Sequence, residues 1–246
     1  MKSATTSDPP LADSRPPVLE LRGVTFRPAQ GGAALLMNVD LVVGEGDMVL
    51  VNLPRAASVR RAVSMMQGLA DPNSGRLQFC GSSWTKGTYE EHFRMRSRIG
   101  RVFDGHAWIE NLNVIENVTL SAQHHGVATQ EVTDRLRRLA DRFGVRRLAD
   151  ERPAYVEAGV LQVYQWIRAL ISSPRLLLLE RPLRSLPADL MSVCRDLVNE
   201  VRQAGTAVIW FTSNEPDWIG SDSVDQLRRF NLVGGELKDL STGVSA

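Results

Sequence analysis

The stretch RALISSPRLLLLE, residues 168–180, decides the fold of this 246-residue chain. Its four consecutive leucines stand between Arg175 and Glu180, and a short run that is apolar throughout is typical of a strand buried on both faces of a parallel sheet. Two more runs of this kind occupy 48–51 and 206–212. Helical patterns lie between these runs, at 58–69 (with Ser58 as a candidate N-cap), 158–172 and 188–204. This alternation predicts an α/β fold with a parallel-rich sheet.

Composition narrows the class of protein. With 43% hydrophobic and 23% charged residues the chain can bury a full core, and a formal net charge of +1 gives no reason to expect nucleic-acid binding. Cys80 and Cys194 are far apart and lack spaced partner ligands, so we expect reduced core thiols and no metal site. No apolar run approaches the roughly 18 residues that span a bilayer, so membrane association is expected only through partners.

Patterning along the chain predicts its domain boundaries. Residues 1–16 are polar and rich in Pro and Ser, which is typical of a disordered tail. Charged, helix-prone segments fill 88–160 and predict a separate helical subdomain. The α/β core is expected over 17–87 and 161–237, and 238–246 is expected to be a C-terminal tail.

Several segments, taken in order, resemble the ATP-binding subunits of ABC transporters. They are VLELRGVT (18–25), GLADPNSG (68–75), IGRVF (99–103), LNVIENV (112–118) and the opening stretch. The resemblance covers about 18–237 and implies an ABC-ATPase core of the RecA-like P-loop type with a helical subdomain.

The positions that touch nucleotide in that family differ in this chain. The Walker A motif G-x-x-x-x-G-K-S/T uses its glycines to wrap phosphates, its lysine to reach the β- and γ-oxygens and its hydroxyl to bind Mg²⁺. Its counterpart here is LPRAASVRR, residues 53–61. The substituted positions are Leu53 and Ser58 for the glycines, Val59 for the lysine, Arg60 for the hydroxyl, and the following Arg61.

The other motifs depart in the same way. Asp104 stands for the glutamine of the Q-loop, Glu180 for the Walker B aspartate, and Ser213 for the histidine of the H-loop. Arg181 replaces the glutamate that serves as general base, and a guanidinium does not accept a proton. The signature LSGGQ corresponds to Val156, Glu157, Ala158, Gly159 and Val160.

These substitutions predict a protein that is not an enzyme and takes neither ATP nor Mg²⁺ as cofactor. It would be a structural or regulatory component of a transport complex. One alternative is residual nucleotide or phosphate binding by Arg55, Arg60 and Arg61, since guanidinium groups bind phosphate without a metal. Another is a soluble scaffold outside transport, and the substituted positions could equally be ordinary packing and surface residues.

The resemblance also implies partners. An ABC transmembrane permease is expected to dock on the helical subdomain, at the inner face of the cytoplasmic membrane, and the chain is expected to form a homodimer or a heterodimer with another ABC ATPase. Candidate contacts are Trp108, Ile109, Val114 and Ile115, which could equally pack inside that subdomain. The segment 103–114 is most similar in shape to the ATPases of lipid-trafficking systems of the MCE type, which implies a lipid cargo.

Overall fold

The computed structural model describes residues 15–27, 34–55, 57–105, 107–213 and 227–240. The predicted terminal tails therefore lie almost wholly outside the described residues. Strand β10 (Glu236–Asp239) includes residues 238 and 239, which the sequence pattern had assigned to the C-terminal tail.

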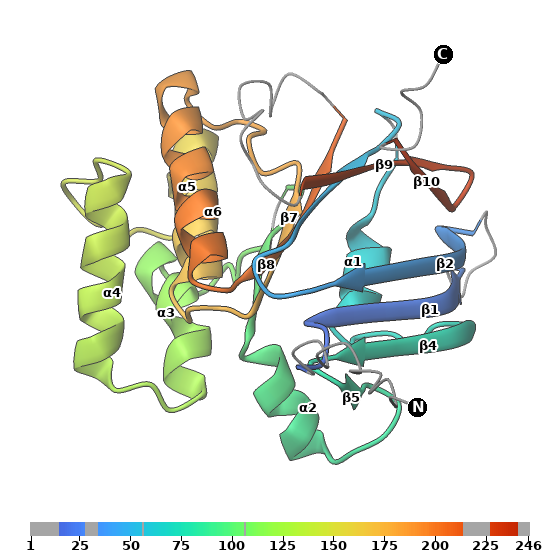
Figure 1. Cartoon of the computed structure of the whole chain (residues 1–246). Coiled ribbons are helices and arrows are strands. Elements are labelled where there is room, and N and C mark those ends of the chain that lie inside the picture. The colour runs from blue at the N-terminus through green and yellow to red at the C-terminus, as the bar shows by residue number, and fades with distance from the viewer. Residues whose placement is uncertain (1–14, 28–33, 56, 106, 214–226, 241–246) are drawn as a thin grey trace, which may run out of the picture.

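Two sheets form the scaffold (Figure 1). The larger has the order β10-β9-β3-β8-β7-β6, in which β9, β3, β8, β7 and β6 run parallel and β10 pairs antiparallel with β9. Its strands are β3 (Met48–Asn52), β6 (Ile99–Val102), β7 (Leu176–Glu180), β8 (Ala207–Thr212), β9 (Leu227–Val233) and β10. The predicted α/β class with a parallel-rich sheet is confirmed.

The second sheet is antiparallel and was not separated from the first by the sequence pattern. Its order is β2-β1-β4-β5, formed by β1 (Leu19–Phe26), β2 (Leu36–Val43), β4 (Ser74–Phe79) and β5 (Ser82–Ser83). Buried and more exposed positions alternate along much of β1 and β2, whereas β7 and β8 are buried at every position. The alternating burial is typical of a sheet that is covered on one face, and the continuous burial is typical of a sheet that is covered on both faces.

Helices cover both faces of the parallel sheet. They are α1 (Arg60–Met66), α2 (Tyr89–Arg96), α3 (Val114–His124), α4 (Thr129–Arg142), α5 (Ala158–Leu170) and α6 (Met191–Gln203), with short 3₁₀ turns at Pro153–Tyr155 and Ala188–Leu190. In β7, Leu176 and Leu178 pack in one core with α1 and the antiparallel sheet. Leu177 and Leu179 face the other core, with α3 to α6. Figure 1 shows α3 to α6 on the side of the parallel sheet away from the antiparallel sheet, whereas α2 lies next to β5.

Local sequence sets where the helices begin. Thr88 with Glu91 and Asn113 with Glu116 form capping boxes at the starts of α2 and α3, each satisfying backbone N–H groups on both sides. Helix α1 begins at Arg60 instead of 58, because Val59 is its N-cap and no side chain caps it. The predicted capping role of Ser58 is therefore wrong.

Candidate functional site

Four loops meet where the parallel strands end. The carboxyl ends of parallel strands lie at one edge of a sheet, which is where open α/β folds bind ligands. Residues 53–55 and 57–59 follow β3, 103–105 follow β6, Arg181 follows β7, and Ser213 follows β8. The structure thus brings together the loop counterparts of Walker A, the Q-loop, the general base and the H-loop.

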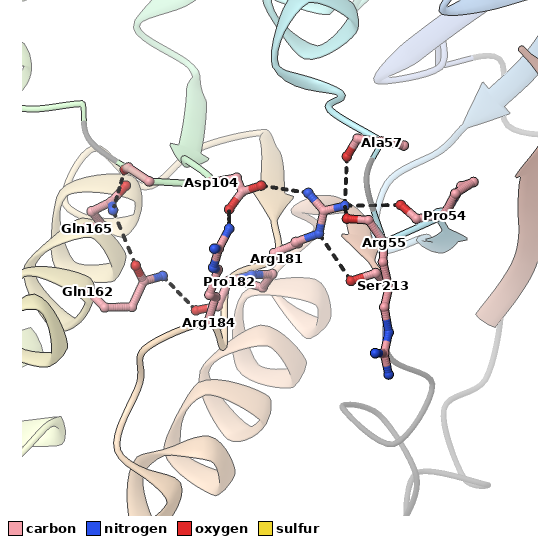
Figure 2. A network of polar contacts seen from close by, with 11 residues as sticks. Pro54, Arg55, Ala57, Asp104, Gln162, Gln165, Arg181, Pro182, Arg184 and Ser213 are labelled. Carbon is pink, nitrogen blue, oxygen red and sulfur yellow. Dashed lines mark hydrogen bonds and ion pairs between the residues drawn. The ribbon is translucent and has the colours of Figure 1, made fainter.

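Arg181 is at the centre of this cluster (Figure 2). Its Nη2 donates to the carbonyl oxygen of Ala57 at 2.7 Å, and lies 3.2 and 3.3 Å from those of Arg55 and Pro54. Its Nη1 donates to Asp104 Oδ2 at 2.6 Å, and its Nε donates to Ser213 Oγ at 3.2 Å. One guanidinium therefore joins all four loops.

Asp104 holds Arg181 from the opposite side. Its Oδ1 accepts a second hydrogen bond, 2.9 Å from Arg184 Nη1, so the carboxylate lies between two guanidinium groups. The side chains of Arg181 and Asp104 are only 11% and 17% exposed, which screens this ion pair less than a surface pair. Arg184, at 68% exposure, contributes from the solvent side.

The backbone of Arg181 adopts a conformation that favours glycine. Its φ is +40°, in the left-handed region, while its N–H donates to the Phe211 carbonyl at 2.8 Å. Such a conformation costs a non-glycine residue about 1–2 kcal/mol. The contacts of the side chain offset this cost, so the local strain and the loop network belong together.

A second, deeper ion pair lies beneath the cluster. The Arg101 Nε donates to Glu180 Oε1 at 2.6 Å, and the two side chains are 3% and 1% exposed. Arg101 also donates to Gln67 Oε1, to Ser64 Oγ and to the Arg60 carbonyl at 2.7, 3.1 and 2.9 Å. The Walker B counterpart Glu180 therefore faces an arginine inside the protein.

The sequence reading missed Arg101. The sequence did hold a clue, since Arg101 is a charged residue in the short strand Ile99–Val102, which lies beside the fully buried β7. A charge at such a position needs a buried partner. Burial raises the pKa of Glu180, and the charge of Arg101 counteracts that rise.

The remaining Walker A positions separate into core and surface. Leu53 and Val59 are buried in the core around α1, at 3% and 4% exposure. Ser58, Arg60 and Arg61 are exposed. Arg55 is exposed as well and offers its carbonyl to Arg181, so the anion site proposed for the three arginines stays a prediction.

The signature counterpart lies at the start of α5. Glu157 is the exposed N-cap of that helix, and its side chain makes no capping hydrogen bond. Val156 is half-buried, Ala158 and Val160 are exposed, and a Cβ on Gly159 would lie 3.2 Å from the Ser185 carbonyl. Further along α5, Gln165 accepts from the Phe103 N–H at 3.0 Å and thereby fixes the loop that carries Asp104.

The candidate permease contacts do not share one environment. Val114 is completely buried between helices and therefore does not reach a partner, which corrects its assignment as a contact. Ile109 is 45% exposed, while Trp108 and Ile115 are partly buried. The Arg168 guanidinium lies 4.5 Å from the ring centre of Trp108.

The loop does not fit a phosphate chain in this arrangement. A phosphate loop binds oxygen atoms through converging N–H groups. Here the carbonyls of Pro54, Arg55 and Ala57 converge instead on Arg181, as Figure 2 shows. The polarity of this part of the site matches a cation.

Comparison with solved structures identifies the class of fold. The chain superposes on the dimeric structure of MJ0796, a bacterial ABC transporter cassette, with a TM-score of 0.77, 21% identity and coverage of 89% of this chain and 96% of that one. A post-hydrolysis state of the same cassette, bound to ADP and Pi, gives a TM-score of 0.75 at 22% identity and the same coverage of both chains. The fold is that of an ABC cassette.

Sequence relatives then identify the family. The lipoprotein-releasing system ATP-binding protein LolD of Ruegeria pomeroyi is 32% identical over 204 residues, which cover 80% of this chain and 89% of the relative. LolD of Roseobacter denitrificans is 26% identical over 91% of this chain and 99% of its own length. This chain belongs to the ATP-binding proteins of ABC transporters. No family model matches it.

These comparisons correct two predictions. The chain was expected to be no enzyme and to take no ATP, but its relatives are named ATP-binding proteins and a similar cassette was solved with ADP and Pi. Both predictions are therefore wrong. They rested on side chains at a few motif positions, whereas the relationship extends over 204 residues.

Proposed function

We propose that this chain is the ATP-binding subunit of an ABC transporter and works beside a membrane-spanning permease at the inner face of the cytoplasmic membrane. The observation that carries the proposal is the relationship to LolD of Ruegeria pomeroyi, which covers 80% of this chain and 89% of that relative. Among the described residues, no helix is long and apolar enough to cross a bilayer. In this proposal, the permease spans the membrane and holds the subunit at its surface.

The permease docks, in this proposal, on the surface around Ile109. This side chain is 45% exposed on a loop that Asn117 holds by accepting from the Ile109 N–H at 2.8 Å and donating to its carbonyl at 3.0 Å. A rigid loop that presents an apolar side chain suits a protein contact, since little conformational freedom is lost on binding. Trp108 and Ile115, which are partly buried, stay candidate contacts in this proposal.

We also propose that the cargo is a lipid or a lipid-modified protein. Two observations support this: the segment 103–114 resembles that of lipid-trafficking ATPases, and LolD relatives from Ruegeria pomeroyi and Roseobacter denitrificans are named for lipoprotein release. The subunit works as a dimer, as the cassette MJ0796 does in its dimeric structure.

The test is purification of the tagged chain from membranes of the organism that encodes it, with the bound permease identified by mass spectrometry. Ile109→Glu should reduce permease recovery at least tenfold. Val233→Glu is the matched control, since Val233 is 52% exposed at the C-terminal end of β9, outside the helical segment. Recovery of no permease by the unmodified chain, or equal recovery by both variants, would count against the proposed docking.

A further inference from the structure

We infer that the Arg181 side chain is an internal ligand of the loop carbonyls of Pro54, Arg55 and Ala57 and keeps the nucleotide site closed, so that nucleotide and Arg181 compete for these loop residues. This inference rests on the proposed function and adds a gate to it. The relatives of this chain are named ATP-binding proteins, yet the carbonyls of Pro54, Arg55 and Ala57 point toward Arg181, where a phosphate would need N–H groups.

The guanidinium group of Arg181 donates hydrogen bonds from every one of its nitrogen atoms. All three of its nitrogens donate: Nη2 to the loop carbonyls, Nη1 to Asp104 and Nε to Ser213. A charged donor held by several acceptors forms stronger hydrogen bonds than a neutral one. The loop is therefore stabilised in the conformation that presents carbonyl oxygens.

The turn inside the loop is fixed at both ends. The Ala57 N–H donates to the Pro54 carbonyl at 2.9 Å, and Arg181 contacts the carbonyls of both residues. Pro54 itself has no N–H to offer a phosphate. Binding of a phosphate chain by N–H groups needs a different orientation of these peptide units, and Arg181 opposes that change.

The position of the Arg181 side chain depends on its ion pair with Asp104. Asp104 is held by Arg184 as well as by Arg181, and the Gln165 contact with the Phe103 N–H positions the loop that carries it. The φ of +40° at Arg181 directs the side chain into the loop at a cost that these contacts offset. Loss of the Asp104 charge should therefore release Arg181 without removing it.

The experiment measures the affinity of the full-length purified chain for a fluorescent ATP analogue, with and without Mg²⁺. Arg181→Gly removes the side chain and suits the positive φ, which guards against misfolding. Asp104→Asn keeps the Arg181 side chain and removes the carboxylate charge that pairs with it. Arg137→Ala, on the exposed face of α4, is the control that loses the same charge.

The gate predicts at least tenfold tighter binding by Arg181→Gly, a smaller gain by Asp104→Asn and no change in Arg137→Ala. Equal or weaker binding by Arg181→Gly, with measurable binding by the unmodified chain, overturns the gate and leaves the proposed function intact. No binding by any of these proteins overturns the gate and removes nucleotide from the proposed function as well. Permease recovery is scored separately, so the two failures are distinguishable.

Discussion

Replacement of Arg101 by Met tests whether the buried ion pair beneath the site has the predicted energetic role. The variant keeps the length and apolar stem of the side chain and removes its charge. Glu180 would then remain at 1% exposure without its cationic partner, and its Oε2 accepts no hydrogen bond from the described residues. Removal of one partner from a buried pair costs about 3–5 kcal/mol.

A second effect sets the pH dependence. Burial raises the pKa of Glu180 while Arg101 lowers it, so the pKa in the variant rises further. A carboxyl whose folded pKa exceeds its unfolded pKa supports the folded state below the unfolded pKa, and this support is lost as the pH rises through the folded pKa. The variant should therefore lose stability, relative to the unmodified chain, as the pH is raised from about 5 to 8.

The assay is urea unfolding followed by the fluorescence of the buried Trp166 and Trp210, at both pH values. Arg142→Met is the control, because the Arg142–Glu200 pair is 42% and 52% exposed and such pairs contribute about 0–1 kcal/mol. The double variant Arg101→Met with Glu180→Leu should recover most of the loss, since apolar replacement of a buried pair is often neutral. A loss in Arg101→Met no larger than in Arg142→Met would refute the reasoning.

Two substitutions test the packing of the scaffold, and one labelling experiment tests the burial of Cys194. Gly100→Ala should destabilise the chain by at least about 2 kcal/mol in urea unfolding, because the new Cβ would lie 2.1 Å from the Ala169 carbonyl; equal stability would be contrary to this packing. Asn117→Ala should cost about 1–3 kcal/mol and speed amide exchange at Ile109, because buried backbone groups lose their partner; unchanged exchange would speak against it. Burial raises the pKa of the Cys194 thiol, so Cys194 should resist alkylation at pH 8 until urea unfolds the chain, and rapid labelling of Cys194 itself in the folded protein, located by peptide mass spectrometry, would contradict its burial.

The sequence predicted the parts of the fold that depend on composition over a whole segment. The runs at 48–51, 176–179 and 207–211 are apolar throughout, and each lies in a strand of the parallel sheet. Strand β9 was not predicted because its LRRFNLV pattern carries two adjacent arginines and is not buried throughout. Pairing with β3 makes it a strand, and that contact is distant in sequence.

The site was predictable in its membership but not in its contacts. The resemblance to ABC ATPases implied that Asp104, Arg181 and Ser213 belong to one site with the loop after β3, and in the structure they follow strands that end at one edge of the sheet. The direction of the Arg181 side chain follows from a positive φ and from carbonyls that belong to another loop. Residue type alone does not specify either of these, which is why the contacts of Arg181 with the loop carbonyls could not be predicted from the sequence.

The amide exchange rate of Ala57, measured by NMR on the nucleotide-free chain, tests most directly whether Arg181 holds the loop closed. This amide donates to Pro54, and Arg181 contacts the carbonyls of both residues. If Arg181 holds the loop closed, exchange at Ala57 is at least tenfold faster in Arg181→Gly and unchanged in Arg137→Ala, since about 1.4 kcal/mol of lost protection corresponds to a factor of ten. An unchanged rate in Arg181→Gly would contradict this role of Arg181.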